Sequence, residues 1–269
     1  MRIGSRVFDK GTHIMGILNV TPDSFSDGGM WNDPEAALLR AERMICDGAE
    51  IIDVGGESTR PGYEPVSEQE EIERVAPVIE RIKKEFNIPV SIDTQKSAVA
   101  RAALGAGADM INDIWGFKGD TNMAAVCREY NASCCLMHNR VDARYKDLAR
   151  DIISDLRESI ELAKAAGIAD DRICVDPGVG FAKTLDENLF ITQNVDLLHE
   201  LGYPILLGTS RKSMIGLSLG LDKDKRLEGT LVTTVLAVQN GCLFVRVHDI
   251  KENFRAIKMA RALFEKARK

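Results

Sequence analysis

The sequence predicts a (β/α)8 TIM barrel, and three observations lead to this fold class. Eight short apolar runs recur along the 269 residues. Segments with helical periodicity separate them, and strands that alternate with helices indicate a parallel sheet. The runs are continuously apolar rather than alternating, which is typical of strands buried on both faces. Eight such units in a chain of this length match the barrel.

An open, doubly wound parallel sheet is the alternative architecture. It is disfavoured because the units number eight and because no G-x-G-x-x-G motif follows the first apolar run. No linker or low-complexity segment divides the chain. Residues 1–269 are therefore expected to form a single domain, with residues 1–12 as an N-terminal hairpin.

The predicted strands cover, in chain order, residues 13–19, 50–56, 90–94, 109–114, 133–138, 172–178, 204–210 and 243–249. A helix over 33–49 is expected to begin with Asp33 as N-cap and Pro34 at the first helical position. A second helix, over 67–86, begins with a capping-box pattern because Glu70 follows Ser67 by three residues. Pro77 interrupts its apolar pattern and is expected to kink it.

Composition narrows the function classes. A net charge of −6 argues against a general nucleic-acid-binding protein, which is normally basic. No run approaches the length of a transmembrane helix, so no membrane partner is expected, and the N-terminal residues lack an apolar signal segment. The six cysteines show neither CxxC nor metal-finger spacing. These features predict a cytoplasmic protein with reduced, mostly buried thiols.

Polar residues gather at one end of every predicted strand. In a (β/α)8 barrel, the loops that follow the strands carry the chemistry. These positions read NVTPDSFSDGG, GGESTRPG, DT, ND, MH, DPGVGF, GTSRKS and RVHD, whereas the ends where strands begin carry ordinary turn residues. This asymmetry predicts an active site at the C-terminal ends of the strands.

The charges at this rim suggest the kind of ligand. The cations in or beside it are Arg60, Lys183, Arg211, Lys212, Arg246 and His248. A cationic cluster in an acidic protein indicates an anionic ligand, and barrels often bind phosphate after strands seven and eight. Asp93, Asn112 and Asp176 lie closer to the barrel axis, where a carboxylate can accept two parallel hydrogen bonds. We expect a flat nitrogen heterocycle below a phosphate or pyrophosphate.

The motifs MGILNVTPDSFSDGG, GGESTRPG, SIDT, INDIWG, DPGVGF, SRKS and VRVHD occur in this order across all eight units. Together they closely resemble the dihydropteroate synthase family. The resemblance implies a transferase of folate biosynthesis that condenses 7,8-dihydropterin-6-ylmethyl diphosphate with p-aminobenzoate, giving dihydropteroate and pyrophosphate. It also implies a Mg²⁺ cofactor, small-molecule substrates as the partners, and a homodimer.

The resemblance further implies roles for individual positions. Catalysis would involve Asp27, Arg60 and Lys212, with Asp27 and Arg60 on loops that close over the reaction. The pterin ring would lie among Asp93, Asn112, Ile114, Met137, Asp176, Phe181 and Lys212. The diphosphate would bind Asn19, Arg246 and His248, and Asn19 would also hold the metal ion. The p-aminobenzoate site would be framed by Phe25, Thr59, Arg60, Pro61, Lys212 and Ser213.

These residue types suit the departure of diphosphate from a methylene carbon. A pterin can delocalise positive charge from that carbon, so an SN1-like path is expected, in which cations and Mg²⁺ stabilise the leaving group. Asp27 would stabilise the developing cation, and the weakly basic amine needs positioning more than deprotonation. Gln95 departs from the family, which more often has an aromatic residue there.

Two other functions stay open. One is a methyltetrahydrofolate:corrinoid methyltransferase, which shares a pterin-binding barrel but does not need SRKS, Arg246 and His248 to grip a diphosphate. The other is a non-catalytic pterin-binding module, which would not need the first loop, STRPG and SRKS together.

Overall fold

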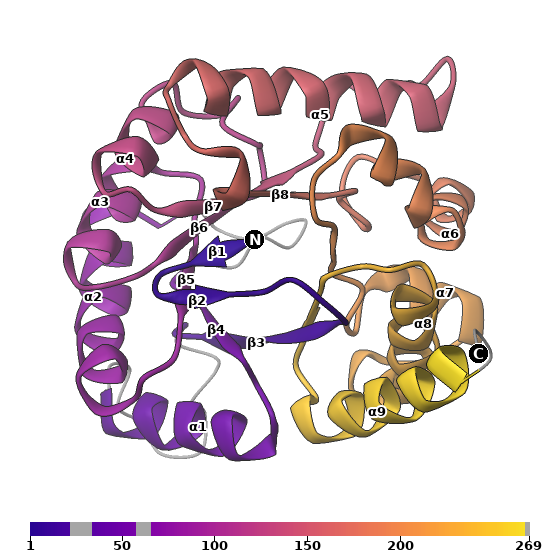
Figure 1. Cartoon of the computed structure of the whole chain (residues 1–269), viewed down its shortest axis with the longest axis horizontal. Helices are drawn as coiled ribbons and strands as arrows, with labels where there is room; N and C mark the ends of the chain where they lie inside the picture. Colours follow the sequence, from indigo (N-terminus) through magenta and orange to yellow (C-terminus); the bar gives the residue numbers. More distant parts are fainter. Residues whose placement is uncertain (22–33, 58–65, 267–269) are drawn as a thin grey trace.

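The eight apolar runs form one parallel sheet that closes on itself (Figure 1). The computed structural model describes residues 1–21, 34–57 and 66–266. The strand order is β8-β7-β6-β5-β4-β3-β10-β9, and a parallel bridge between Val175 and Ile205 joins the two edges. The helices surround the sheet on the outside, so the predicted (β/α)8 TIM barrel is confirmed.

The strands and helices follow the predicted alternation. The barrel strands are β3 (His13–Asn19), β4 (Ile51–Gly55), β5 (Val90–Asp93), β6 (Met110–Asp113), β7 (Ser133–Met137), β8 (Ile173–Asp176), β9 (Leu206–Leu207) and β10 (Phe244–Val247). The helices are α1 (Pro34–Asp47), α2 (Glu68–Glu85), α3 (Ser97–Gly105), α4 (Met123–Glu129), α5 (Leu148–Ala165), α6 (Leu185–Gln193), α7 (Ser213–Leu219), α8 (Leu227–Gln239) and α9 (Ile250–Lys266). None of these helices combines the length and the hydrophobicity needed to cross a bilayer.

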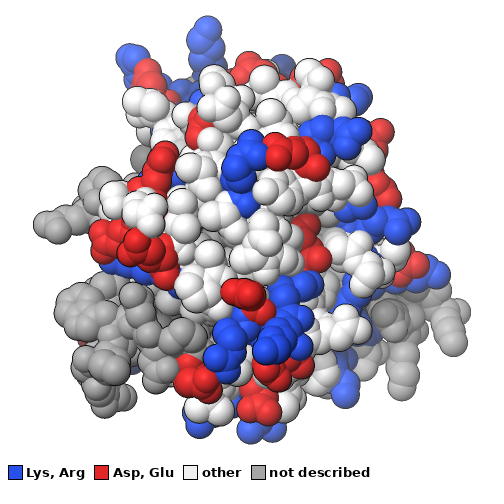
Figure 2. All heavy atoms as spheres, turned by 90° about the vertical axis from the view of Figure 1, so that its left-hand side faces the viewer, with Lys and Arg blue, Asp and Glu red and all other residues white. Residues whose placement is uncertain are grey.

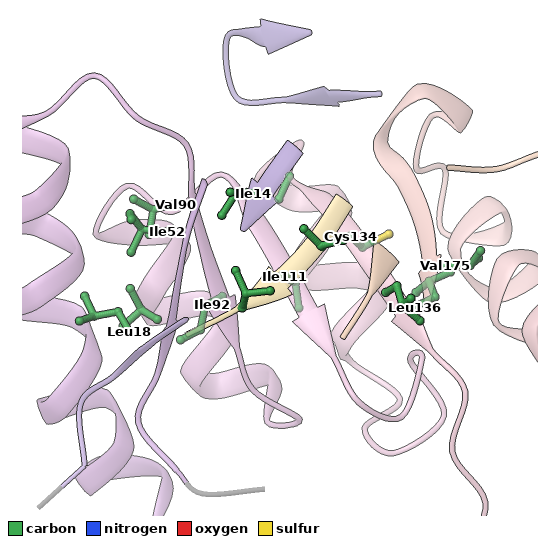
Figure 3. Packing of buried hydrophobic residues seen from close by; sticks show 14 of the residues in the cluster. Ile14, Leu18, Ile52, Val90, Ile92, Ile111, Cys134, Leu136 and Val175 are labelled. Atoms are coloured by element: carbon green, nitrogen blue, oxygen red, sulfur yellow. The ribbon is translucent and has the colours of Figure 1, made fainter. Parts of the chain in front are cut away.

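Side chains on each strand alternate between the helices and the barrel interior. Outward residues such as Ile14, Ile52, Ile92 and Val175 pack in the layer between sheet and helices (Figure 3). The inward residues near the strand starts form a second apolar cluster, which includes Met15, Ile51, Met110, Cys135, Cys174, Leu206 and Phe244. Apolar side chains therefore fill the base of the barrel, and the inward positions further along the strands can be polar.

An N-terminal hairpin covers this base. β1 (Arg2–Ile3) and β2 (Arg6–Val7) pair antiparallel and lie across the front of the barrel in Figure 1. Ser133, the first residue of β7, donates a hydrogen bond to the carbonyl of Arg2. Phe8 packs edge-on against Phe244 with 5.4 Å between the ring centroids.

The starts of the first two helices agree with their sequence signals. α1 begins at Pro34. The Ser67 side chain accepts a hydrogen bond from the Glu70 amide at 3.2 Å at the start of α2. α2 continues through Pro77, so this proline does not end the helix.

The outer helical face carries mixed charge. Figure 2 shows Lys and Arg side chains interspersed with Asp and Glu on the side of the molecule formed by α1 to α4. Arg101 of α3 pairs with Glu129 of α4, and Arg81 of α2 pairs with Glu35 of α1 at 2.7 Å. Such exposed pairs add little to stability.

A buried ion cluster ties α2 to the loops after β4 and β5. The Lys96 ammonium lies 2.8 Å from a Glu71 oxygen and 3.0 Å from a Glu57 oxygen, and it donates to the carbonyl of Val66. Glu71 is fully buried, and burial raises its pKa.

We expect Lys96→Met to lower the free energy of unfolding by about 3–5 kcal/mol, because it leaves buried carboxylates without a cation. The raised pKa of Glu71 means that the folded variant binds a proton that the unfolded chain has released. The loss should therefore be larger at pH 8 than at pH 5. Urea unfolding at both pH values measures it, with the exposed Lys164→Met as control. Equal losses in the two lysine variants would contradict the prediction.

Candidate active site

Polar side chains replace apolar ones inside the barrel toward the strand ends. Strand register places Asp93 of β5 beside Asn112 of β6 and Gly55 of β4. The Arg246 Nε atom of β10 donates to Asp53 Oδ2 at 2.5 Å, and its Nη2 atom donates to Asp93 Oδ2. The four strands thus bring two carboxylates, an amide and a guanidinium together.

The carboxylates of this cluster keep unused hydrogen-bonding capacity. Asp53 Oδ2 also accepts from Asn112 Nδ2 at 3.2 Å. Asp53 Oδ1 and Asp93 Oδ1 are buried and have no hydrogen-bond partner among the described residues. Burial raises the pKa of Asp93 to about 7, although Arg246 works in the opposite direction. Orphaned acceptors of this kind require a donor, so the cluster suits a ligand with N–H groups.

Asp176 adds a further carboxylate from the opposite side of the barrel. It ends β8, and its Oδ1 atom accepts a hydrogen bond from the Gly178 amide at 2.6 Å. Burial raises the pKa of Asp176. A Cβ atom at Gly208 would lie 3.5 Å from Asp176 Oδ2, so glycine leaves room beside that oxygen.

Lys212 lies against the loop that follows β8. Its ammonium donates to the carbonyl of Val179 and lies 4.6 Å from the centre of the Phe181 ring. Gly180 has a positive φ of 86°, and a Cβ there would lie 3.0 Å from Lys212 Cδ. Burial lowers the pKa of Lys212 to about 8, against the attraction of Asp176.

Two apolar residues border the polar cluster. Met137 is buried at the end of β7, in register with Asp176, and Ile114 is buried just after β6. With Phe181, they supply the surfaces against which a flat ring can pack.

The loops after β9 and β10 meet at Ser210. Its hydroxyl lies 2.9 Å from His248 Nδ1 and accepts from the His248 amide at 3.2 Å. Ser213 begins α7 at the same rim. Arg211, counted among the rim cations, pairs with Asp249, so its charge is neutralised within the protein.

The predicted Mg²⁺ ligand, Asn19, lies at the rim of the barrel. Asn19 ends β3, and a Cβ at Gly55 would lie 3.6 Å from its amide oxygen and 3.9 Å from Asp93 Oδ2. In the described residues, no group of three or more His, Cys, Asp or Glu side chains could hold a metal ion. Mg²⁺ takes oxygen ligands and is usually held by few protein groups together with substrate phosphates, so an amide oxygen at the rim could supply one ligand.

Five of the predicted site residues lie outside the described residues: Phe25, Asp27, Thr59, Arg60 and Pro61. The others lie in the last two residues of a strand, on the loop that follows it or, for Ser213, at the start of α7: Asn19, Asp93, Asn112, Ile114, Met137, Asp176, Phe181, Lys212, Ser213, Arg246 and His248.

Asp53 is the site residue that the sequence analysis missed. It lies in the middle of an apolar strand. Polar residues were considered only at the strand ends in the sequence analysis. The sequence did contain a signal for Asp53, namely a carboxylate within an apolar run. Buried charges are paired or bind a ligand, so such a residue indicates a partner or a site. Its partner, Arg246, lies 193 residues away in sequence.

Comparison with known proteins agrees with this geometry. A family model described as "Pterin binding enzyme" matches residues 15–248. The fold and the site thus define the class: the chain is a pterin-binding enzyme built on a (β/α)8 barrel.

Named relatives give the particular family. The dihydropteroate synthase of Clostridium beijerinckii is 60% identical over 262 residues, which cover 96% of this chain and 97% of that protein. A Clostridium difficile dihydropteroate synthase, crystallised in the presence of pteroic acid, matches with a TM-score of 0.93 and 50% identity, covering 96% of this chain and 98% of that one. The Xanthomonas albilineans enzyme, solved with 4-aminobenzoic acid, matches with a TM-score of 0.90 and 40% identity, covering 94% and 93%. The chain belongs to the dihydropteroate synthase family.

Proposed function

We propose that this protein condenses 7,8-dihydropterin-6-ylmethyl diphosphate with p-aminobenzoate to give dihydropteroate and pyrophosphate. The observation that carries the proposal is the buried set of Asp53, Asp93, Asn112 and Asp176, with two carboxylate oxygens that have no partner among the described residues. A pterin presents adjacent N–H donors on one edge, which such acceptors would bind. The pteroic acid and the 4-aminobenzoic acid with which two related enzymes were crystallised belong to the same chemistry.

The ring would be held at its edge and on its faces. Asp176 would accept from the 2-amino group and the neighbouring ring N–H, since a carboxylate can take two parallel hydrogen bonds. Asp93 and Asn112 would bind the other polar atoms of the ring. Phe181, Met137 and Ile114 would pack near its faces.

The leaving diphosphate would interact with His248 at the rim and with Arg246, whose guanidinium also pairs with Asp53 and Asp93. Arg246 and His248 would bind it more strongly as its charge grows, which lowers the barrier to an SN1-like departure. Asn19 would hold Mg²⁺ against the diphosphate, and the ion would supply positive charge beside the departing oxygens.

The second substrate would bind above the ring. Lys212 and Ser213 would contact p-aminobenzoate with Phe25, Thr59, Arg60 and Pro61. Asp27 would stabilise the positive charge on the pterin methylene carbon. Positioning of the amine is the main requirement, because this nucleophile needs no prior deprotonation.

An assay for pyrophosphate release tests the proposal. Release should require both the dihydropterin diphosphate and p-aminobenzoate. Release without p-aminobenzoate, or none with both substrates, would contradict it. Methyl transfer from methyltetrahydrofolate would favour the corrinoid methyltransferase, and pterin binding without turnover would favour a binding module.

We expect Asn19→Ala and His248→Ala each to weaken the Mg²⁺-dependent binding of pyrophosphate. Removing a hydrogen bond to a charged group costs about 1.5–3 kcal/mol, roughly a tenfold to hundredfold loss. Calorimetric titration with pyrophosphate and Mg²⁺ measures it, and the exposed His199→Ala serves as control. Unchanged affinity in both variants would contradict these assignments.

We also propose a homodimer formed through α7 and α8. Leu217 and Leu219 of α7 and Val232 of α8 are exposed apolar side chains, with 67%, 52% and 69% of their surface accessible. Apolar groups that gather on neighbouring helices are typical of an interface. A monomeric mass in sedimentation would contradict this assembly.

A cytoplasmic location is also part of the proposed function, and the six free cysteines fit a reducing compartment.

A further inference from the structure

The loop that joins β8 to α6, residues 177–184, has an unusual backbone. Gly178, Gly180 and Ala182 have positive φ angles of 70°, 86° and 47°. A Cβ atom at Gly178 would lie 1.9 Å from the carbonyl oxygen of His138, so the loop passes directly over the end of β7. The two glycines adopt such angles without strain. Ala182 is the residue for which this conformation is costly, and it persists only when surrounding contacts fix it.

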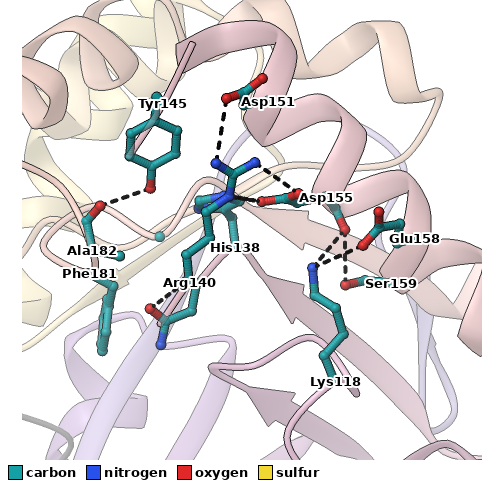
Figure 4. Close-up of polar contacts among 12 residues, drawn as sticks. Lys118, His138, Arg140, Tyr145, Asp151, Asp155, Glu158, Ser159, Phe181 and Ala182 are labelled. Carbon is teal, nitrogen blue, oxygen red and sulfur yellow. Dashed lines mark hydrogen bonds and ion pairs between the residues drawn. The ribbon is translucent and has the colours of Figure 1, made fainter. Parts of the chain in front are cut away.

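Two side chains outside the pterin pocket bind the carbonyl groups of the 177–184 loop. The Lys183 ammonium donates to the carbonyls of Gly178 at 3.0 Å and Phe181 at 3.1 Å. The Tyr145 hydroxyl donates to the carbonyl of Ala182 at 2.8 Å (Figure 4). These contacts leave the loop little freedom to change shape.

His138 completes the coordination of Lys183. Its Nδ1 atom lies 2.9 Å from the Lys183 Nζ atom, and its Nε2 atom lies 2.9 Å from Asp155 Oδ2. An ammonium group only donates, so Nδ1 accepts and the imidazole proton is on Nε2. Burial lowers the pKa of His138 to about 4 and that of Lys183 to about 7. Arg140 also binds Asp155, with its Nε atom 2.5 Å from Oδ2, which anchors this aspartate of α5 (Figure 4).

We call Asp155, His138, Lys183 and Tyr145 the loop clamp. The loop that they hold carries three groups of the ring pocket. The Gly178 amide binds Asp176, the Val179 carbonyl binds Lys212, and the Phe181 ring lies 4.6 Å from the same ammonium. A change in the clamp therefore reaches the pocket through the loop backbone.

We propose that Lys183 and His138 are positioning residues for the pterin ring, which act by holding the 177–184 loop in its ring-binding shape. This inference rests on the proposed function and extends it to residues to which no role in the reaction was assigned above. The residues proposed to bind the diphosphate are Arg246 of β10 and His248, the first residue after it. Binding of pyrophosphate should therefore not depend on the loop clamp.

The test compares substitutions that break the clamp with one that preserves it. Lys183→Met and His138→Leu remove the central contact. His138→Gln keeps it, because a glutamine amide can accept from Lys183 and donate to Asp155. Tyr145→Phe removes one hydroxyl and keeps the ring. Lys118→Met is the matched control, since this lysine contacts the other side of the same aspartate, through its carbonyl at 3.1 Å (Figure 4).

We expect Lys183→Met and His138→Leu to raise the dissociation constant of 6-hydroxymethylpterin about tenfold. His138→Gln should stay within about threefold of the wild type, Tyr145→Phe should lose about threefold, and Lys118→Met should not change. The affinity for pyrophosphate with Mg²⁺ should stay the same in every variant. Circular dichroism and thermal unfolding check that each variant is folded.

Equal pterin affinity in His138→Leu and wild type would overturn the inference, as would equal losses in His138→Leu and His138→Gln. A parallel loss for all ligands would make the clamp merely structural. If Lys183→Met does not fold, the comparison of His138→Leu with His138→Gln, together with Tyr145→Phe, still tests the inference. A wild type that binds pterin but releases no pyrophosphate would overturn the proposed function and leave the comparison of pterin affinities intact.

Discussion

Asp176→Ala is expected to lose binding of a pterin that lacks the diphosphate while the barrel remains folded. Its carboxylate would accept two hydrogen bonds from the ring, and each hydrogen bond to a charged group contributes about 1.5–3 kcal/mol. Losing both would cost about 3–6 kcal/mol, or on the order of 10²–10⁴ in affinity. Titration with 6-hydroxymethylpterin measures the loss.

A second substitution separates ring binding from loop geometry. Asp176 Oδ1 also accepts from the Gly178 amide at 2.6 Å, and Asp176→Ala removes that contact as well. Asp176→Asn can keep the contact through its amide oxygen. Its amide NH2 group would then face the N–H donors of the pterin ring and could not accept from them. Both variants should therefore lose the pterin.

Both Asp176 variants should keep much of their affinity for pyrophosphate with Mg²⁺, since that site lies on other loops. The exposed Asp196→Ala is the control for a lost negative charge. Normal pterin binding in a folded variant would show that Asp176 does not contact the ring. Loss of both ligands would contradict the division into separate ring and diphosphate pockets.

Arg246→Met is expected to destabilise the protein and to lower turnover together. Its guanidinium neutralises Asp53 and Asp93 in the barrel interior, with 2.5 Å from Nε to Asp53 Oδ2. Removing one partner of a buried ion pair costs about 3–5 kcal/mol, because the other charge stays buried and uncompensated. Turnover should fall by roughly 10²–10³, the usual cost of losing one group that stabilises a developing charge.

The destabilisation should depend on pH in a defined direction. Burial raises the pKa of Asp93 to about 7 in the wild type, and loss of Arg246 raises it further. Between the ordinary pKa of a carboxyl and this raised value, the folded protein binds a proton that the unfolded chain has released. The free energy of unfolding therefore falls as pH rises through this window. The loss caused by Arg246→Met should be larger at pH 8 than at pH 5.

A double variant gives the sharper comparison. Asp53→Asn combined with Arg246→Met removes a buried charge of each sign, so it should be more stable than Arg246→Met alone but equally inactive. Urea unfolding and the pyrophosphate assay report the two properties separately. Arg157→Met, which breaks an exposed pair with Glu200, controls for the loss of an arginine. A double variant no more stable than the single one would contradict the pairing.

The sequence was sufficient for the fold because the barrel depends on a repeated local pattern. Each buried strand reads as an apolar run, and Ser67 and Pro34 mark the helix starts where the structure has them. At Pro77 the helix continues, because packing can hold a helix together across a proline, and the kink stays a prediction.

The site was less accessible to sequence reasoning because its contacts join distant strands. Asp93, Asn112 and Asp176 could be grouped because each lies at or near a strand end. Asp53 could not, since its role follows from strand register and from its contact with Arg246. Lys183 looked like a free cation of the rim, whereas the structure directs its ammonium to His138 and two carbonyls.

The apolar base of the barrel has a consequence for how ligands enter and leave the site. Met15, Ile51, Phe244 and their neighbours fill the end that the hairpin covers, whereas the ring-binding carboxylates lie deeper than the rim. Any molecule bound against Asp53 and Asp176 must enter and leave by the strand-end mouth. A second reactant seated above it obstructs that exit and lengthens the residence time of the deeper one. Dissociation of the pterin should consequently slow as p-aminobenzoate is added, even where the two molecules share no direct contact.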